Sequence, residues 1–416
     1  MELRDYVLGE ELPQYSSAIT PGKHCPLFGV SSVIKYVDHV TAIYLGTRDC
    51  VYFAMKQFLT SPADAPTRAR VVAAELTDSD IVFGILPSLK KLVQEEYESH
   101  HPSIIFIVTS CSVEVISEDV EGCAALLDQQ LPCSVRVIRT EHFKTTGYYE
   151  GIERTLEAMM TELPPARTDE ASFSILGARF PGAETCEPAR ILKRHGYRLN
   201  SNLPFDCREE TVSALSQSAF TLVVDCTGIQ AAEKLQKAYG IPCFRLDSRF
   251  DLEGLEKTYR ALSEKTGIPL EEFLADKAEA ENWMEKGRKA LRGKTFVYSN
   301  VMHYAFEGAW FLGELGMIPK CIFIGSALDR TDRFLKKLQE KYNPQLYTNA
   351  NSDAILAMLD RYEPDYLVGN MMNSQQLLSR GIRHAVLPGV PVECGYRYVA
   401  ETVRRLVEAE SGGKSL

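Results

Sequence analysis

The sequence lacks a long apolar stretch. Its 416 residues contain no segment that approaches the roughly 20 consecutive apolar residues of a membrane helix. The first residues, MELRDYVLGEEL, are too acidic and too polar for a signal peptide. We therefore expect a protein that does not enter the membrane, and the cytoplasm is its expected compartment.

Clustered positive charge is also missing. The formal net charge is −10, and Lys and Arg are scattered along the chain. Binding to nucleic acid or to an anionic membrane surface requires a basic patch, so neither is an expected partner. Binding to a protein partner with a basic face remains an alternative. Hydrophobic residues make up 45% of the chain, which is enough for large buried cores.

Nucleotide-binding motifs are absent as well. The segment GARFPG (177–182) lacks the glycine spacing of a dinucleotide fingerprint, and no GK[ST] sequence of a phosphate-binding loop occurs. We therefore expect any nucleotide chemistry to belong to another protein.

Cysteine, in contrast, is abundant. The chain has 11 cysteines, and an odd number spread over this length does not indicate a disulfide framework. Some are expected to be metal ligands. Cys123, Cys133, Cys243 and Cys321 stand beside apolar residues, and we expect these to be buried, small apolar side chains.

Short apolar runs alternate with longer amphipathic segments. Runs of this kind are typical of parallel strands that helices cover on both faces. We therefore expect an α/β protein of three Rossmann-like domains, each with a parallel sheet flanked by helices. The predicted strands are 40–46, 104–110, 134–139, 173–178, 221–225, 295–299, 321–325 and 365–369.

Two breaks divide the chain. The segment TELPPARTDEAS (161–172) interrupts both helical and strand periodicity. A charged helical stretch (262–294) ends near Gly293, which is well placed as a helix stop. We predict a first domain with a cluster site at 1–165, a second with a candidate cofactor cysteine at 166–293, and a third at 294–416.

Three cysteines of the first domain lie at strand or turn boundaries. Cys25 lies in GKHCPLFGV, Cys50 in YLGTRDCVYF and Cys111 in FIVTSCSVEV. Open α/β sheets place ligands beyond the carboxyl ends of their strands, and helix N-termini favour thiolates. Iron–sulfur clusters usually take four thiolates, so three imply a fourth ligand from a partner. The spacing alone fits a metal site and buried structural thiols equally well.

The residues around these cysteines carry a family resemblance. Four segments resemble the N-terminal domain of the nitrogenase component 1 superfamily, and TSCSVEVISED is the most specific match. The resemblance implies that Cys25, Cys50 and Cys111 bind an iron–sulfur cluster at a subunit interface. This cluster would be either a 4Fe-4S cluster or a larger, P-cluster-like 8Fe cluster, of which this chain holds one half. It also implies a heterotetramer with a paralogous subunit and a separate ATP-dependent iron–sulfur reductase. The segments are HCPLFGVSSVIKYVDHVTAIYLGTRDCVYF, VAAELTDSDIVFG, HPSIIFIVTSCSVEVISEDVEG and 143–160.

A second cysteine position concerns the substrate. The stretch TLVVDCTGIQAAEKLQKAYGIPCF resembles the place where family members anchor a catalytic cofactor, which would be an additional iron–sulfur cofactor on Cys226. A buried small residue at a tight turn is the alternative. The resemblance implies a histidine as second ligand. His384 is our candidate, and His303 and Cys394 are less suited alternatives.

One difference from the family pattern bears on the expected reaction. Where nitrogen-reducing members have paired histidines after a glycine, this chain has Ile152 and Glu153 after Gly151. We therefore do not expect dinitrogen reduction. The resemblance favours a nitrogenase-like reductase of a small substrate, such as a methylthio-alkane reductase that cleaves C–S bonds. Alternatives are the N subunit of light-independent protochlorophyllide reductase, a non-catalytic scaffold for cofactor assembly, and a cluster-free α/β binding protein.

Overall fold

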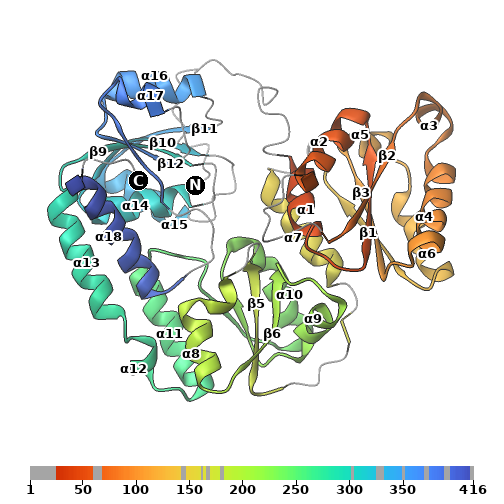
Figure 1. Ribbon diagram of the computed structural model, residues 1–416, viewed down its shortest axis with the longest axis horizontal. Helices are drawn as coiled ribbons and strands as arrows, with labels where there is room; N and C mark the ends of the chain where they lie inside the picture. Colours follow the sequence, from red (N-terminus) through yellow and green to blue (C-terminus); the bar gives the residue numbers. More distant parts are fainter. Residues whose placement is uncertain are drawn as a thin grey trace. The chain divides into compact units, whose positions relative to one another are not determined.

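The structure is a computed structural model in which the chain forms two compact units (Figure 1). Of the described residues, those within 25–184 and 196–243 form the N-terminal unit, and those within 185–195 and 244–412 form the C-terminal unit. The structure describes residues 25–59, 68–141, 147–160, 163–164, 169–178, 182–300, 304–324, 332–348, 352–369, 374–387 and 394–412.

The first sheet of the N-terminal unit (orange in Figure 1) has the parallel strand order β2-β1-β3-β4. Alternate strand residues face two separate cores, as the two-residue period of a strand requires. Tyr44 and Phe106 face the core shared with α1 and α7, whereas Ile43 and Ile105 face the core shared with α4 and α6. The elements are α1 (Pro26–Ile34), β1 (Val40–Gly46), α2 (Arg48–Leu59), β2 (Arg70–Glu75), α3 (Asp78–Phe83), α4 (Leu86–His100), β3 (Ile104–Thr109), α5 (Cys111–Ile116), α6 (Val120–Gln130), β4 (Ser134–Arg139) and α7 (Tyr148–Met159).

A second parallel sheet (green in Figure 1) has the order β6-β5-β7-β8. Its core is continuous with that of the first sheet, because Leu176 and Val223 belong to the same buried cluster as Ile152 and Leu156 of α7. The elements are β5 (Ser172–Ala178), η3 (Ala183–Thr185), β6 (Arg198–Pro204), α9 (Glu209–Ser213), η4 (Ala214–Gln217), β7 (Thr221–Val223), η5 (Cys226–Gly228), α10 (Ile229–Tyr239) and β8 (Cys243–Arg245).

The third parallel sheet has the order β11-β10-β9-β12-β13 and lies in the C-terminal unit. Helix α13 packs along α18, and it ends at Leu291 shortly before Gly293, whose φ of +77° suits a helix stop as expected. The elements are α8 (Glu187–Arg194), α11 (Leu252–Thr266), α12 (Leu270–Phe273), α13 (Lys277–Leu291), β9 (Thr295–Asn300), α14 (Ala305–Glu314), β10 (Ile318–Ile324), α15 (Asp332–Lys341), β11 (Gln345–Thr348), α16 (Ser352–Tyr362), β12 (Tyr366–Gly369), α17 (Ser374–Leu378), β13 (Arg383–Ala385) and α18 (Tyr396–Gly412).

The predicted fold class, an α/β protein with three parallel sheets flanked by helices, is confirmed. Each predicted strand is present, with ends shifted by up to three residues. The domain boundaries at 165/166 and 293/294 stay a prediction. Among the described helices, none combines the length and the apolar character that crossing a membrane requires.

Candidate cluster-binding site

Cys25, Cys50 and Cys111 all lie at helix N-termini in the N-terminal unit. Cys25 is the N-cap of α1 and precedes Pro26. Cys50 lies in the first turn of α2, directly after β1, and Cys111 is the first residue of α5, directly after β3. Because β1 and β3 are paired neighbours in a parallel sheet, their carboxyl ends bring Cys50 and Cys111 to the same sheet edge.

A glycine allows the two strand-to-helix turns to approach closely. A Cβ atom at Gly46, the last residue of β1, would lie 2.3 Å from Oγ of Ser110 and 3.9 Å from Cβ of Cys50. The first distance is shorter than real Cβ contacts, so any larger residue at position 46 would push the β3–α5 turn away. Gly46 therefore fixes the spacing between the segments that carry Cys50 and Cys111.

A second pair of glycines positions Cys25. A Cβ atom at Gly29 of α1 would lie 1.8 Å from the carbonyl oxygen of Tyr148, and one at Gly151 of α7 would lie 1.9 Å from the carbonyl oxygen of Pro26. Helices α1 and α7 therefore meet main chain against main chain. This contact holds the N-terminal end of α1, where Cys25 lies, in a fixed position.

The three thiols lie close enough to influence one another electrostatically. Burial raises the pKa of the Cys25 thiol to about 11, and negative charge on Cys111 or Cys50 would raise it further, whereas the backbone N–H groups of Leu27 and Phe28 lower it. Burial likewise raises the pKa of Cys111, as does charge on Cys50. All three residues are partly buried. The fold thus brings the three predicted ligands together.

Within the described residues, these cysteines are not grouped as the ligands of a single metal ion. Four thiolates around one zinc ion lie about 4 Å apart, and the described residues contain no group of three or more His, Cys, Asp or Glu side chains that could hold one metal ion. A cluster takes each thiolate on a different iron atom, which allows a wider spacing. The raised pKa values of Cys25 and Cys111 mean that these two thiols need nearby positive charge to ionise, which cluster iron would supply.

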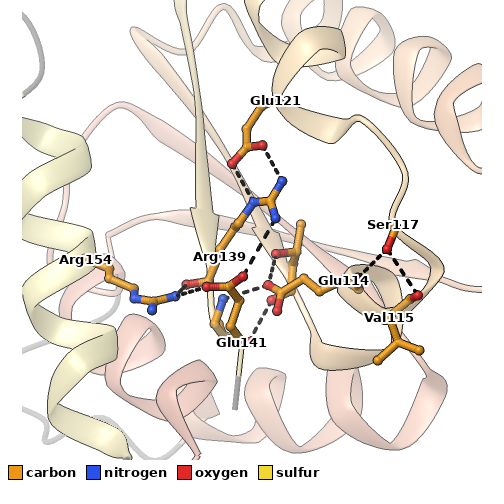
Figure 2. Close-up of polar contacts among 9 residues, drawn as sticks. Glu114, Val115, Ser117, Glu121, Arg139, Glu141 and Arg154 are labelled. Carbon is orange, nitrogen blue, oxygen red and sulfur yellow. Dashed lines mark hydrogen bonds and ion pairs between the residues drawn. The ribbon is translucent and has the colours of Figure 1, made fainter. Parts of the chain in front are cut away.

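A polar network anchors the helix that begins at Cys111 (Figure 2). Oε1 of Glu114, on α5, accepts hydrogen bonds from the hydroxyl group of Thr109 at 2.5 Å and from the backbone N–H of Thr140 at 2.9 Å. Burial raises the pKa of the Glu114 carboxyl group, and these hydrogen bonds lower it. Glu114 therefore ties α5 to the ends of β3 and β4.

Arginine side chains extend this network to neighbouring elements. Arg139 of β4 pairs with Glu121 of α6 and approaches Glu141 at 3.8 Å. Arg154 of α7 donates to the carbonyl oxygen of Arg139 at 2.8 Å and lies 3.4 Å from Glu141 (Figure 2). The elements around Cys111 are thus joined to α7, which also positions Cys25.

Cys226 lies in η5, at the end of β7, and is 3% exposed. It belongs to the buried core that includes Leu156 and Leu176. Its Sγ lies 3.8 Å from Oδ1 of Asp225, whose carboxylate also accepts from the backbone N–H of Thr227 at 3.1 Å. This environment is compatible with the buried structural alternative, and the ligand role of Cys226 stays a prediction.

The candidate second ligands are not grouped with Cys226 in one compact unit. His384 belongs to the C-terminal unit, and its Nε2 lies 3.1 Å from the carbonyl oxygen of Gly369, a contact that satisfies one ring nitrogen. His303 lies outside the described residues. Cys394 is buried in contact with Cys186. A cofactor role for His384 stays a prediction.

The cysteines predicted to be buried are so with one exception. Cys123, Cys133 and Cys321 are buried, but Cys243 is only partly buried. Cys243 begins β8 at the sheet edge, and its Sγ lies 3.8 Å from the side-chain oxygen of Gln236. The apolar neighbours of Cys243 in the sequence did not reveal this edge position.

The fold and the site define a class of protein, a parallel α/β chain with three partly buried thiols at helix N-termini, two of them at one sheet edge. This chain belongs to the family of nitrogenase component 1 type oxidoreductases, whose model matches residues 25–396. The resemblance seen in the sequence is thereby confirmed. The family name supports an oxidoreductase activity for this chain.

Proteins with similar sequences are named either as nitrogenase subunits or as proteins of cofactor biosynthesis. A nitrogenase molybdenum-iron protein alpha chain from Clostridium pasteurianum is 27% identical over 296 residues, which are 67% of this chain and 55% of that protein. The nitrogenase iron-molybdenum cofactor biosynthesis protein NifE from Methanococcus maripaludis is 24% identical over 326 residues, which are 75% of this chain and 66% of that protein. This chain thus spans only about half to two thirds of these relatives.

A solved structure supports the fold. The structure titled "Nitrogenase Cp1 at pH 5" superposes with a TM-score of 0.70 at 20% identity, covering 97% of this chain and 90% of that chain. At this level of identity the likeness concerns the fold alone.

Proposed function

We propose that this chain is the catalytic subunit of a nitrogenase-like iron–sulfur reductase. It would receive low-potential electrons from an ATP-dependent reductase partner and reduce a small substrate, with C–S bond cleavage as the favoured reaction. The observation that carries the proposal is that Cys50 and Cys111 lie at one edge of the first sheet, with Cys25 close enough to be influenced electrostatically by both. These residues would hold the cluster, and the bound cluster supplies reversible one-electron chemistry.

The remaining ligand of the cluster is assigned to a partner. Three thiols from this chain leave at least one iron of a 4Fe-4S cluster, or half of an 8Fe cluster, to be held by another subunit. We propose a paralogous subunit in a heterotetramer, because a chain with the same fold offers an equivalent sheet edge. The partial exposure of the three cysteines is consistent with a site that a second chain covers.

An exposed apolar surface near the same edge supports docking of a protein partner. Phe83 and Val82 of α3 are 83% and 72% exposed, and Val115 of α5 is 70% exposed. The segments that follow the two helices are in contact, because Oε1 of Glu118 accepts a hydrogen bond from the backbone N–H of Ile85 at 3.3 Å. Exposed large apolar side chains at this density mark interaction sites. We assign Val82, Phe83 and Val115, here called the docking surface, to the electron-donating partner.

The substrate would bind beside a second cofactor on Cys226. Ile152, which follows Gly151 in α7, is fully buried and apolar, so this helix lacks an imidazole group at that position. This supports a substrate other than dinitrogen. His384 remains our candidate for the second ligand of this cofactor.

Two alternatives rest on specific observations. The buried environment of Cys226 favours an enzyme that needs no metal there, such as the N subunit of light-independent protochlorophyllide reductase. The similarity to a protein named for cofactor biosynthesis favours a non-catalytic scaffold. Turnover of a small substrate distinguishes an enzyme from a scaffold.

Metal analysis of two variants tests the proposal. The chain is purified anaerobically with its co-expressed neighbour, and iron, sulfide and the EPR spectrum are measured. We expect Cys111→Ser to lose most of the interface-cluster signal because it removes a thiolate ligand. We expect Cys226→Ala to lose the iron of the second cofactor while the interface-cluster signal remains.

The matched controls are Cys123→Ser and Cys207→Ala, which alter buried cysteines elsewhere in the same unit. Full iron content in Cys111→Ser would refute the cluster assignment. Unchanged iron in Cys226→Ala would make Cys226 structural and would favour the protochlorophyllide-type alternative.

A further inference from the structure

Two buried cysteines outside the cluster site lie together in the C-terminal unit. Cys186 is the N-cap of α8, and Cys394 lies two residues before α18. They are 2% and 5% exposed, and both are free thiols. Their side chains lie near each other, because Cys186 raises the pKa of the Cys394 thiol and both residues line the same cavity. The fold has therefore brought two distant cysteines side by side.

The contact is held by the residue that follows Cys186. The buried carboxylate of Glu187 accepts hydrogen bonds from the backbone N–H of Tyr396 at 3.2 Å and of Arg397 at 2.9 Å. It also accepts one from the hydroxyl group of Tyr259 at 2.8 Å. Hydrogen bonds to a carboxylate are stronger than those between neutral groups. Glu187 thus clamps the segment after Cys394 onto the start of α8.

A glycine makes this close approach possible. Gly395 has a φ of +113°, and a Cβ atom there would lie 2.6 Å from Cδ of Glu187. Any other residue would face both backbone strain and a steric clash with the clamp. The position of Cys394 beside Cys186 is therefore fixed by two independent features, the clamp and the glycine.

A pocket gives small molecules access to the pair. Both cysteines line a cavity of about 590 Å³, together with side chains of both charges. In the part of the chain that the structure describes, the guanidinium groups of Arg190 and Arg397 form no ion pair. Asp276 and Glu279 supply negative charge on the same wall. This lining complements a zwitterionic molecule that carries both carboxylate and ammonium groups.

We propose that Cys186 and Cys394 form a reversible thiol–disulfide exchange site, which a zwitterionic peptide disulfide of the glutathione type oxidises through this pocket. The thiolate of one cysteine attacks the peptide disulfide, whose S–S bond breaks and releases one peptide thiolate. The second cysteine then attacks the mixed disulfide and releases the other. The two protein thiols lose two electrons and two protons, and two peptide thiols are formed.

The surroundings of Cys394 affect both the rate and the equilibrium of disulfide formation with Cys186. Contact with Cys186 and burial raise the pKa of the Cys394 thiol, so the reduced form gains no stability as a thiolate. A disulfide carries no charge and loses nothing by burial. The positive charge of the buried Arg249 acts in the opposite direction and favours the attacking thiolate. These conditions favour a stable disulfide that forms once an oxidant enters the pocket.

Differential alkylation of the complete protein tests the proposal. The chain, co-purified anaerobically with its neighbour, is equilibrated with mixtures of reduced and oxidised glutathione, alkylated and digested for mass spectrometry. We expect alkylation of Cys186 and Cys394 to be lost together, and a linked peptide pair to appear. In Cys186→Ser, Cys394 should instead retain one glutathione.

Controls separate this site from the cluster and from general oxidation. Cys321→Ser, which alters a buried cysteine of the same unit, should leave the linked pair unchanged. Arg397→Gln should slow oxidation by glutathione disulfide several-fold while leaving the rate with an uncharged disulfide unchanged. Iron content should be unaffected in Cys394→Ser, whether or not the cluster proposal holds.

Three results would overturn the proposal. Cys186 and Cys394 of the wild-type protein could remain fully alkylated in the most oxidising mixture. Each cysteine could carry glutathione without any linked pair. Loss of iron in Cys394→Ser would make this residue a metal ligand instead.

Discussion

Glu307 places a carboxyl group in the core of the C-terminal unit. Its Oε1 accepts hydrogen bonds from the backbone N–H groups of Arg249 and Phe250 at 2.7 and 2.8 Å and from the hydroxyl group of Ser248 at 2.8 Å. Burial raises the pKa of Glu307, and these hydrogen bonds only partly oppose the shift. The folded chain therefore binds the proton more tightly than the unfolded chain does.

This shift predicts a pH dependence of stability with a definite sign. The stabilisation from the Glu307 proton is complete below the unfolded pKa of about 4.3 and is lost as the pH rises toward the raised folded pKa. We expect the free energy of unfolding of the wild type, relative to Glu307→Gln, to fall by up to about 1.4 kcal/mol per pH unit in this window. Urea unfolding at a series of pH values measures it.

The control is Glu98→Gln, because Glu98 is exposed on α4. As an exposed surface substitution, it should change the free energy of unfolding by no more than about 0.5 kcal/mol. If Glu307→Gln shows a difference from the wild type that does not change with pH, the Glu307 carboxyl group titrates at the same pH in both states and its raised pKa is refuted.

Some residues of the candidate site could be predicted from the sequence, and others could not. Cys25, Cys50 and Cys111 could be predicted as ligands because they stand in family motifs at strand or turn boundaries, and their ligand role stays a prediction. Glu114 and Gly46 were not predicted as positioning residues, since their partners, Thr140 and Ser110, are distant in sequence. Only the tertiary contacts reveal that these residues hold the ligand segments in place.

At the scale of elements, the contact between α1 and α7 allows a direct test. A methyl group at Gly151 would overlap the carbonyl oxygen of Pro26, so Gly151→Ala must displace α1 and with it Cys25. Overpacking of this kind costs about 1–3 kcal/mol. We expect the free energy of unfolding to fall by that amount and the iron content to decrease. Chemical denaturation and iron analysis measure both.

Gly412→Ala is the matched control, since a Cβ atom at this helical glycine would meet nothing within 4 Å. It should leave stability and iron content unchanged or slightly improve stability. Wild-type stability together with full iron content in Gly151→Ala would show that α1 is not held by this contact.

The strands that were not predicted share one feature. Central strands are covered on both faces, so their sequences are mostly apolar and easily recognised. The central strands are β1, β3, β5, β7, β9, β10 and β12. Each strand that was missed lies at the edge of its sheet, where solvent-facing positions accept polar residues. The missed strands are β2, β6, β8, β11 and β13. The fold class therefore followed from the sequence, whereas among the edge strands only β4 did.

At the scale of the whole molecule, the docking surface can be tested by its most exposed residue. Phe83→Asp places a charge where an apolar contact is proposed, and a central interface residue of this kind contributes about 2 kcal/mol or more, roughly a 30-fold change in affinity. We expect electron delivery from the reductase partner to weaken by this order. Binding kinetics and partner-dependent cluster reduction measure the effect.

The control is Leu378→Asp, because Leu378 is 72% exposed in the C-terminal unit. This variant should accept electrons like the wild type, and both variants should keep full iron content. If Phe83→Asp is reduced by the partner at the wild-type rate, the docking surface lies elsewhere on the chain.

The backbone contact between α1 and α7 has a consequence for how this site tolerates sequence change. Helices that meet through side chains can absorb a substitution by repacking, but at Gly29 and Gly151 the two helices meet through backbone atoms, where no side chain can move. Mutations on the outer faces of both helices can accumulate without altering the position of Cys25. If Cys25 binds a cluster as proposed, the same rigidity limits how far Cys25 can move with that cluster, so any adjustment must come from the segments that carry Cys50 and Cys111, or from the partner.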